Sequence, residues 1–165
     1  MKQPDPGHID NILQQLDFGP KLVVPLVREV PAAILKRRPA PGVWSAHEHA
    51  CHLPAVQPLM MTRLEYILSD PAPVIEPYEP ANDDPDDALL KVDLDEAMER
   101  FSRERRAMLD HLRKLTPEEW SITAEHGEYS HYSVFIMFRH IALHDLYHAY
   151  RIEQRLLNKD WADAR

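Results

Sequence analysis

The feature that most constrains the fold of this sequence is a stripe of apolar residues between positions 94 and 115. Successive members of the stripe are alternately four and three residues apart, the spacing of a helix face that packs inside a helical bundle. An Asp93-x-x-Glu96 capping box comes at its start and predicts where the helix begins. The one charged member is Arg105. The full stripe is Leu94, Met98, Phe101, Arg105, Met108, Leu112 and Leu115.

A second stripe predicts a last helix from about Ser130 to about Asn158. Its members are Val134, Met137, Ile141, His144, His148 and Arg151. Another helix is predicted from Ser45, which forms an S-x-x-E capping box with Glu48, to about Leu68. Pro54 and Pro58 lie inside this helix, so we expect a kink there.

The region of about residues 8–36 is also helical in pattern, but we expect it to be interrupted at Gly19-Pro20, Pro25 and Pro31. Residues 71–85 hold five of the 15 prolines and predict a long connection. No segment alternates with period two over a length that would make a sheet. The sequence therefore predicts an all-α four-helix bundle that spans residues 1–165 as a single domain.

The composition excludes several classes of partner. Cys51 is the only cysteine, so there is no internal disulfide, which fits a reducing cytoplasm. The first residues carry no signal-peptide pattern, and no stretch approaches the roughly 20 apolar residues of a membrane span. The net charge is −8 and the basic residues are not clustered. We expect a cytoplasmic protein that binds neither a membrane nor nucleic acid.

The histidines carry the main functional signal. His144 and His148 are one helical turn apart and continue an apolar stripe, so they should face the core, where imidazoles need partners. His140 lies roughly 40° and 80° around the helix from these two and is worse placed to join them. His52 follows Glu48 by one turn and could complete a three-histidine metal site. Because ten histidines in 165 residues also produce chance pairs, core or half-buried histidines remain the alternative.

Two segments resemble the DinB/YfiT-like family. "WSAHEHACHL" is similar to the family's W-S-x-x-E-x-x-x-H-L motif, and "HDLYH" is similar to its later H-x-x-x-H motif. The resemblance covers about residues 10–157 and implies a four-helix bundle, often dimeric, with a divalent metal held by His52, His144 and His148. Relatives are described as thiol-dependent S-transferases, isomerases or hydrolases. The chain departs from the family's common pattern at Gln57 and Arg151.

Two hypotheses of function follow. The first is an enzyme dependent on a divalent metal, with zinc or nickel preferred, that acts on a small molecule and uses a low-molecular-weight thiol as partner in S-transfer, or water in hydrolysis. The second is a non-enzymatic metal-binding or stress-response protein. An open coordination position favours the first, whereas a fourth histidine such as His49 or His140 favours the second.

Arg105 and Arg151 are the candidate catalytic residues, because either could hold an anionic group near the metal. For Arg105 the alternative is that its stem packs in the core while the guanidinium reaches water.

The last helix also has a second apolar face, formed by Phe135, Leu143, Leu146 and Tyr150. This face predicts a homodimer, unless the 71–92 connection or the N-terminal segment covers it.

Overall fold

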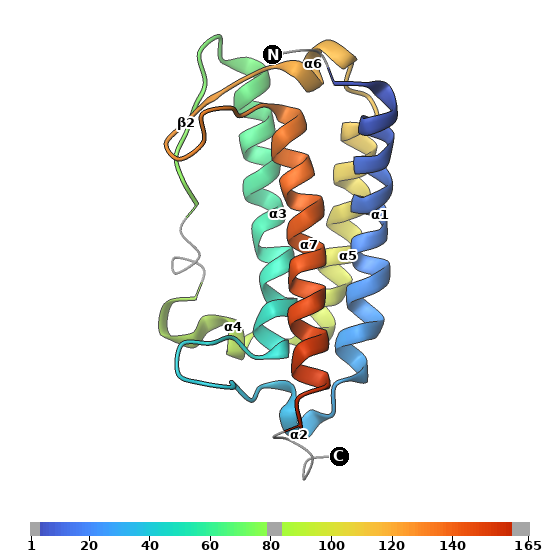
Figure 1. Cartoon of the computed structure of the whole chain (residues 1–165), viewed down its shortest axis with the longest axis vertical. Coiled ribbons are helices and arrows are strands. Elements are labelled where there is room, and N and C mark those ends of the chain that lie inside the picture. Colours follow the sequence, from blue (N-terminus) through green and yellow to red (C-terminus); the bar gives the residue numbers. More distant parts are fainter. Residues whose placement is uncertain (1–3, 79–83, 160–165) are drawn as a thin grey trace.

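The computed structural model describes residues 4–78 and 84–159. Four long helices lie along one axis: α1 (Pro6–Glu29), α3 (Ala46–Ser69), α5 (Leu94–Leu112) and α7 (Val134–Leu156). Helices α1 and α7 run in one direction and α3 and α5 in the other (Figure 1). Because α1 and α3 each pack against both α5 and α7, the predicted four-helix bundle is confirmed.

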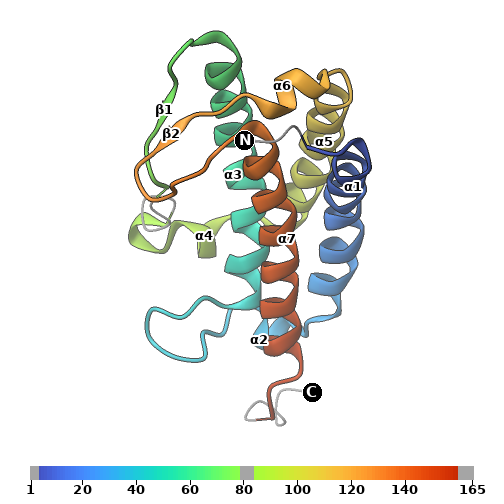
Figure 2. The same cartoon turned by 45° about the horizontal axis from the view of Figure 1, so that its top comes forward.

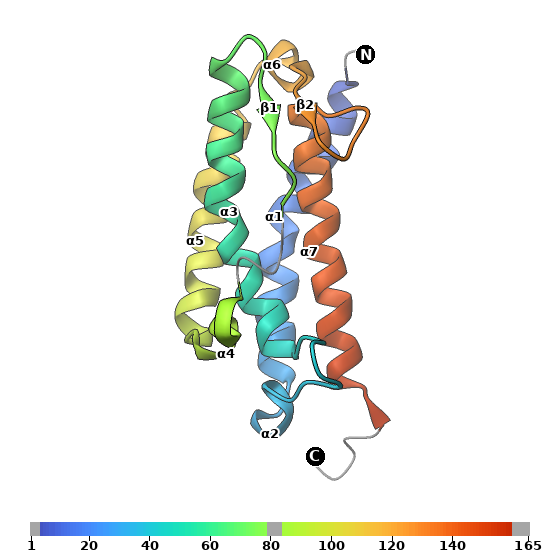
Figure 3. The same cartoon turned by 90° about the vertical axis from the view of Figure 1, so that its left-hand side faces the viewer.

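Helices α3 and α5 are consecutive long helices that run parallel, so the chain must travel back along the whole bundle between them. This connection contains the two-residue strand β1 (Val74–Ile75), the turn η2 (Pro85–Asp87) and the short helix α4 (Ala88–Lys91). Figure 2 shows β1 and α4 to the left of α3, and in Figure 3 β1 lies in front of the space between α3 and α7. The prediction of a long connection in this region is consistent with that course.

The connection is attached to the loop before α7 by a short strand pair. Strand β1 pairs in parallel with β2 (Glu125–His126), with Val74 opposite Glu125. The short helices α2 (Ala32–Leu35) and α6 (Pro117–Ser121) complete the described elements. The strand pair holds β2, which contains His126, and Figure 3 shows β2 beside the end of the bundle where α7 begins.

Local caps define where the helices begin. The side chain of Ser45 accepts from the backbone of Glu48, and the Glu48 side chain accepts in return, so the predicted capping box is present. Asp93 caps α5 in the predicted position by accepting from the backbone of Glu96 at 2.9 Å, but the return bond from the Glu96 side chain, which would complete the predicted capping box, is not among the hydrogen bonds of the described residues. Helix α7 begins at Val134 with Ser133 as its cap, a few residues later than about Ser130.

The prediction that Gly19-Pro20 and Pro25 interrupt the first helix is wrong, because α1 is continuous from Pro6 to Glu29 and only Pro31 ends it. Pro20 has no N–H, so it leaves the carbonyl of Leu16 without its helical donor. Arg105 replaces that donor through Nη1 at 2.8 Å. In α3, Pro58 leaves the carbonyl of Pro54 free in the same way, and Arg100 donates to it at 2.7 Å.

The stripe on α5 faces the core as predicted. Met98, Phe101, Arg105, Met108 and Leu112 are all buried. Within the described residues, none of the helices combines the length and the hydropathy that a membrane span requires.

Candidate metal centre

His52, His144 and His148 meet between α3 and α7. Nε2 of His144 lies 3.2 Å from Nε2 of His52 and 3.0 Å from Nε2 of His148. Among the described residues, this is the group of histidine, cysteine and carboxylate side chains that could hold a metal ion, with all ligand atoms within 4.8 Å of one another. The arrangement arises because His144 and His148 are one turn apart on α7 and antiparallel α3 brings His52 against them.

These distances fit a shared cation. Two nitrogens at roughly 2.0–2.1 Å from a tetrahedral zinc ion lie about 3.3–3.4 Å apart, close to the distances observed. Hydrogen bonding alone cannot satisfy the three nitrogens, because each Nε2 carries either one proton or one in-plane lone pair. Nε2 of His144 can therefore bond to only one of its two neighbours, whereas a cation accepts lone pairs from all three.

Burial keeps the two imidazoles of α7 neutral, the form that a metal requires. Burial, followed by the nearby His52, lowers the pKa of His144 to about 3. Burial, followed by the nearby His144, also lowers the pKa of His148 well below its ordinary value. The two α7 histidines are therefore predominantly neutral at pH 7.

The other candidate histidines are placed differently. His140 is exposed and its ring lies 6.2 Å from the ring of Tyr129, at the edge of the site as its helical position predicts. His49 is buried and its Nδ1 lies 2.9 Å from Nδ1 of His148, on the side of that ring away from Nε2. Neither belongs to the group of three convergent ligand atoms.

A hollow of about 140 Å³ opens beside His144. Its apolar wall comes from α3 and α7 and includes Val56, Met60, Met137 and Ile141. Its polar wall includes Arg63, Tyr129, Tyr132, His126 and His140. Three of these rings form a cluster: the ring of His126 lies 4.6 Å from those of both Tyr129 and Tyr132 and is tilted to each, whereas the two tyrosine rings are nearly parallel.

Arg63 is not among the predicted site residues, although the sequence carries a signal for it. Arg63 follows His52 by 11 residues, which is about three helical turns and returns to the same face. Val56 and Met60 lie on that face for the same reason. The contribution of His126 had no such local signal, because it depends on the strand pair that holds the loop in place.

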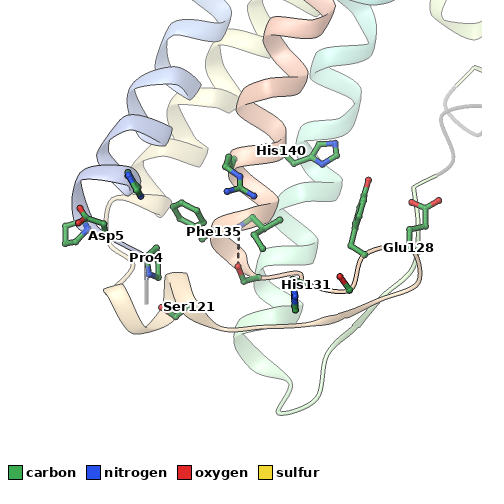
Figure 4. Close-up of a pocket in the computed structure, with 14 residues that line it drawn as sticks. Pro4, Asp5, Ser121, Glu128, His131, Phe135 and His140 are labelled. Carbon is green, nitrogen blue, oxygen red and sulfur yellow. Dashed lines mark hydrogen bonds between the residues drawn. The ribbon is translucent and has the colours of Figure 1, made fainter. Parts of the chain in front are cut away.

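A larger and more open hollow, of about 1330 Å³, lies at the end of the bundle where α1 and α7 begin. Figure 4 shows Pro4 and Asp5 at one of its sides, Glu128 at the other, and His140 on α7 between them. His140 lines both hollows, so it lies at the boundary between this open region and the hollow beside His144.

The family model of the DinB superfamily matches residues 15–152 of the chain. The chain belongs to the DinB superfamily. No curated protein matches it at a significant level. Among solved structures, it is similar to YfiT from Bacillus subtilis, with a TM-score of 0.79 and 16% identity over 94% of this chain and 91% of that one. YfiT is described as a probable metal-dependent hydrolase with an unusual four-helix bundle topology.

Arg105 is not exposed to water in this member of the DinB superfamily, so the interpretation that its guanidinium reaches solvent is wrong. The side chain is 2% exposed. Its Nε donates to Gln57 at 2.9 Å, and Nη1 and Nη2 donate to Asp145 at 2.5 and 3.2 Å. Arg105 is not among the residues that line the hollow beside His144.

Arg151 lies one turn beyond His148 and is partly buried. Its Nη1 donates to Gln154 at 3.0 Å, and the guanidinium lies 5.8 Å from the ring of Tyr147. Its positive charge contributes to the lowered pKa of His148, although less than burial and the neighbouring histidines do. It too is absent from the lining of the hollow beside His144.

Cys51 has the environment of a core residue. It is 2% exposed, and burial raises the pKa of its thiol to about 12. A thiol with such a pKa is protonated at pH 7 and is a poor nucleophile.

Proposed function

We propose that this protein is a cytoplasmic enzyme dependent on a divalent metal, with zinc or nickel held by His52, His144 and His148, and of the hydrolase or thiol S-transferase type. Its substrate is a small molecule, and a low-molecular-weight thiol is the partner in the S-transfer reaction. A bound divalent cation would supply Lewis-acid chemistry, polarising a substrate bond or making a water or thiol more acidic.

The observation that carries the proposal is the convergence of three Nε2 atoms beside a hollow. Catalytic zinc sites have three protein ligands and an open position, whereas structural sites have four protein ligands. Within the described parts of the chain, no fourth histidine, cysteine or carboxylate joins the three. The open position is thus available to a substrate that enters from the hollow.

The size and lining of the hollow bound the substrate. A cavity of about 150 Å³ accommodates benzene, so 140 Å³ suits a compact group of similar size. Val56, Met60 and Ile141 would contact an apolar group, and Tyr129 and Tyr132 would exclude water from it. Arg63 and Glu128 are the oppositely charged side chains in this lining, so a negative group of the substrate would bind on the side of Arg63, away from Glu128.

The candidate catalytic arginines take different parts in the proposal. Arg105 acts through structure, because its guanidinium is committed to Asp145, Gln57 and the carbonyl of Leu16. Arg151 remains a candidate for binding an anion on the other side of His148. It is partly exposed, and at Nε no hydrogen-bond acceptor lies within reach among the described residues.

Metal analysis of single-alanine variants tests the site. His52→Ala, His144→Ala and His148→Ala should each lose most of the zinc or nickel and the metal-dependent rise in Tm, because each removes one of three ligands. His140→Ala is the matched control from the same helix and should keep both. Unchanged metal content in all three ligand variants would overturn the site.

A screen of the zinc-loaded and nickel-loaded proteins for thiol transfer to electrophiles and for ester and amide hydrolysis tests the activity. Turnover that disappears in His144→Ala but persists in His8→Ala, at an exposed histidine outside the lining of the hollow beside His144, is the expected result. A wild-type protein that binds metal tightly and turns over none of these substrates would favour the non-enzymatic metal-binding alternative.

A further inference from the structure

His49 is a buried histidine outside the group of three ligands, and its ring contacts the ring of His148. It lies on α3 one turn before His52 and is 4% exposed. Its Nδ1 is 2.9 Å from Nδ1 of His148, while Nε2 of His148 faces His144 at 3.0 Å. The two nitrogens of His148 thus have separate partners, one on the side of the metal centre and one on the side of His49.

The protonation of this pair follows from the chemistry of the imidazole ring. Two neutral Nδ1 atoms at hydrogen-bonding distance require that one carries a proton and the other a lone pair. A metal on Nε2 of His148 takes the lone pair of that nitrogen, so the proton of the neutral ring must be on Nδ1. Nδ1 of His148 is then the donor, and Nδ1 of His49 is the acceptor.

We propose that His49 is a positioning residue that accepts this hydrogen bond and so fixes the tautomer and the ring orientation of His148 for metal binding. The inference rests on the proposed three-histidine metal site and adds to it a residue outside the ligand set. Metal-binding histidines commonly donate their second nitrogen to a carboxylate or a backbone carbonyl, and here an imidazole takes that place.

The packing around the pair supports a fixed geometry. The ring of Trp44 lies 5.5 Å from the ring of His49, 4.9 Å from that of His52 and 6.1 Å from that of His148. One indole therefore contacts a ring on each of the two metal-binding helices together with His49. Arg155 donates to the carbonyl of Trp44 at 2.9 Å, which holds the start of α3 against α7.

The position of His49 also explains why it is not a fourth ligand. An atom that faces Nδ1 of His148 is on the opposite side of that ring from Nε2 and cannot reach a cation there. Nε2 of His49 is buried, and among the described residues it has no hydrogen-bond partner. His49 therefore leaves the coordination position beside the hollow open.

Three variants at position 49 separate the hydrogen bond from packing. Asparagine places its amide oxygen near the former Nδ1 and keeps an acceptor there, whereas glutamine extends its amide toward the former Nε2 and leucine has no acceptor. Zinc affinity, measured by competition with a chromophoric chelator, should fall roughly 10- to 100-fold in His49→Leu and His49→Gln. In His49→Asn it should stay within about threefold of the wild type, because only that variant keeps the acceptor.

The outcomes distinguish this inference from the proposed function. If the wild type binds zinc and His49→Leu binds it equally well, His49 has no positioning role and the metal site stands. Equal losses in the asparagine and glutamine variants would assign the effect to packing and overturn the hydrogen bond. If the wild type binds neither zinc nor nickel, the proposed function fails, and this inference with it.

A measurement on the wild type decides the matter even if a variant does not fold. Long-range ¹H–¹⁵N NMR spectra of the zinc-loaded protein report which nitrogen of each histidine carries the proton. We expect the proton on Nδ1 of His148 and on Nε2 of His49. A proton on Nδ1 of His49 in the zinc-loaded protein would overturn the inference.

Discussion

Arg105 on α5 and Asp145 on α7 form an ion pair inside the bundle, next to His144 in sequence. Their side chains are 2% and 1% exposed, and Nη1 of Arg105 lies 2.5 Å from Oδ2 of Asp145. The same Nη1 donates to the carbonyl of Leu16 on α1. The pair thus connects three helices at the α7 residue that follows His144.

The first prediction concerns this pair. Arg105→Met leaves the carboxylate of Asp145 buried without its cation, which costs about 3–5 kcal/mol of unfolding free energy. Urea denaturation of the metal-free protein should show that loss. The double variant Arg105→Met/Asp145→Leu should recover much of it, because it removes both charges. A single variant as stable as the wild type would mean that methionine simply completes the apolar stripe.

The second prediction concerns Gly19 on α1. A Cβ at this position would lie 2.3 Å from Oδ2 of Asp145 and 3.1 Å from Nη1 of Arg105. Alanine inside a helix normally stabilises by up to about 1 kcal/mol relative to glycine, but the crowding here costs roughly 1–3 kcal/mol. Gly19→Ala should therefore lower the unfolding free energy and the Tm. Gly7→Ala, where Cβ would meet only an exposed Asp5 side chain at 3.2 Å, is the control and should change little.

Much of the fold was predictable because its signals are local. The stripe from Leu94 to Leu115 and the caps at Ser45 and Asp93 each depend on a few neighbouring residues, and the structure confirms these helices. The prediction that Gly19-Pro20 breaks the first helix was wrong because the contact that decides it is not local. Its effect depends on Arg105, which is 85 residues away and supplies the donor that Pro20 lacks.

The candidate site was predictable in part. Helical spacing indicated that His144 and His148 share a face, but it could not show which other helix meets that face. The position of His52 one turn after Glu48 made it a candidate, the resemblance to the family strengthened that choice, and the structure brings the three together. The partners of His49 and Asp145 come from other helices, so residue spacing within one helix could not reveal either contact.

The third prediction concerns Glu48, which anchors the start of α3. Burial alone would raise the pKa of this carboxyl, but hydrogen bonds from Arg38 and Ser45 outweigh it and lower the pKa below its ordinary value of 4.5. A group with a lowered pKa in the folded state stabilises the protein above the unfolded-state pKa, and that contribution is lost as the pH falls through the folded-state value. Glu48→Gln should be less stable than the wild type at pH 7, and the difference should narrow below pH 4.5.

Denaturant unfolding of both proteins at pH 7 and at steps down to about pH 3 measures this effect. A difference between the wild type and Glu48→Gln that stays constant over this range would show that the charge of Glu48 does not stabilise the fold. The hydrogen bond from Arg38 Nε, at 2.9 Å, identifies Arg38→Met as a second variant with the same expected pH dependence.

The fourth prediction concerns assembly. Leu143 and Tyr150 on the second face of α7 are 60% and 61% exposed, so no described segment of the chain covers them, whereas Phe135 and Leu146 are partly buried. We propose that a second copy of the chain covers this face. Sedimentation velocity at micromolar concentration should show a dimer, and Leu143→Glu should convert it to a monomer. Phe18→Glu, at another exposed apolar residue on α1, should leave the dimer intact. A monomeric wild type would refute the proposal.

The fifth prediction concerns the hollow beside His144. If a compact group of the substrate occupies it, a zinc ligand with a ring should bind more tightly than one without. We therefore expect benzohydroxamate to inhibit or bind the zinc-loaded protein more strongly than acetohydroxamate, in proportion to the apolar surface that the ring buries.

Val56, which is 4% exposed and lines the hollow, is the residue to enlarge in order to test this preference. Val56→Phe fills the space without removing a metal ligand, so it should keep zinc but abolish the preference for the ring. Thr62→Phe adds the same ring at an exposed position on the same helix and should keep that preference. Isothermal titration of both hydroxamates into the three proteins measures the preference for the ring. Equal affinities of the wild type for the two hydroxamates would show that the hollow does not bind the ring.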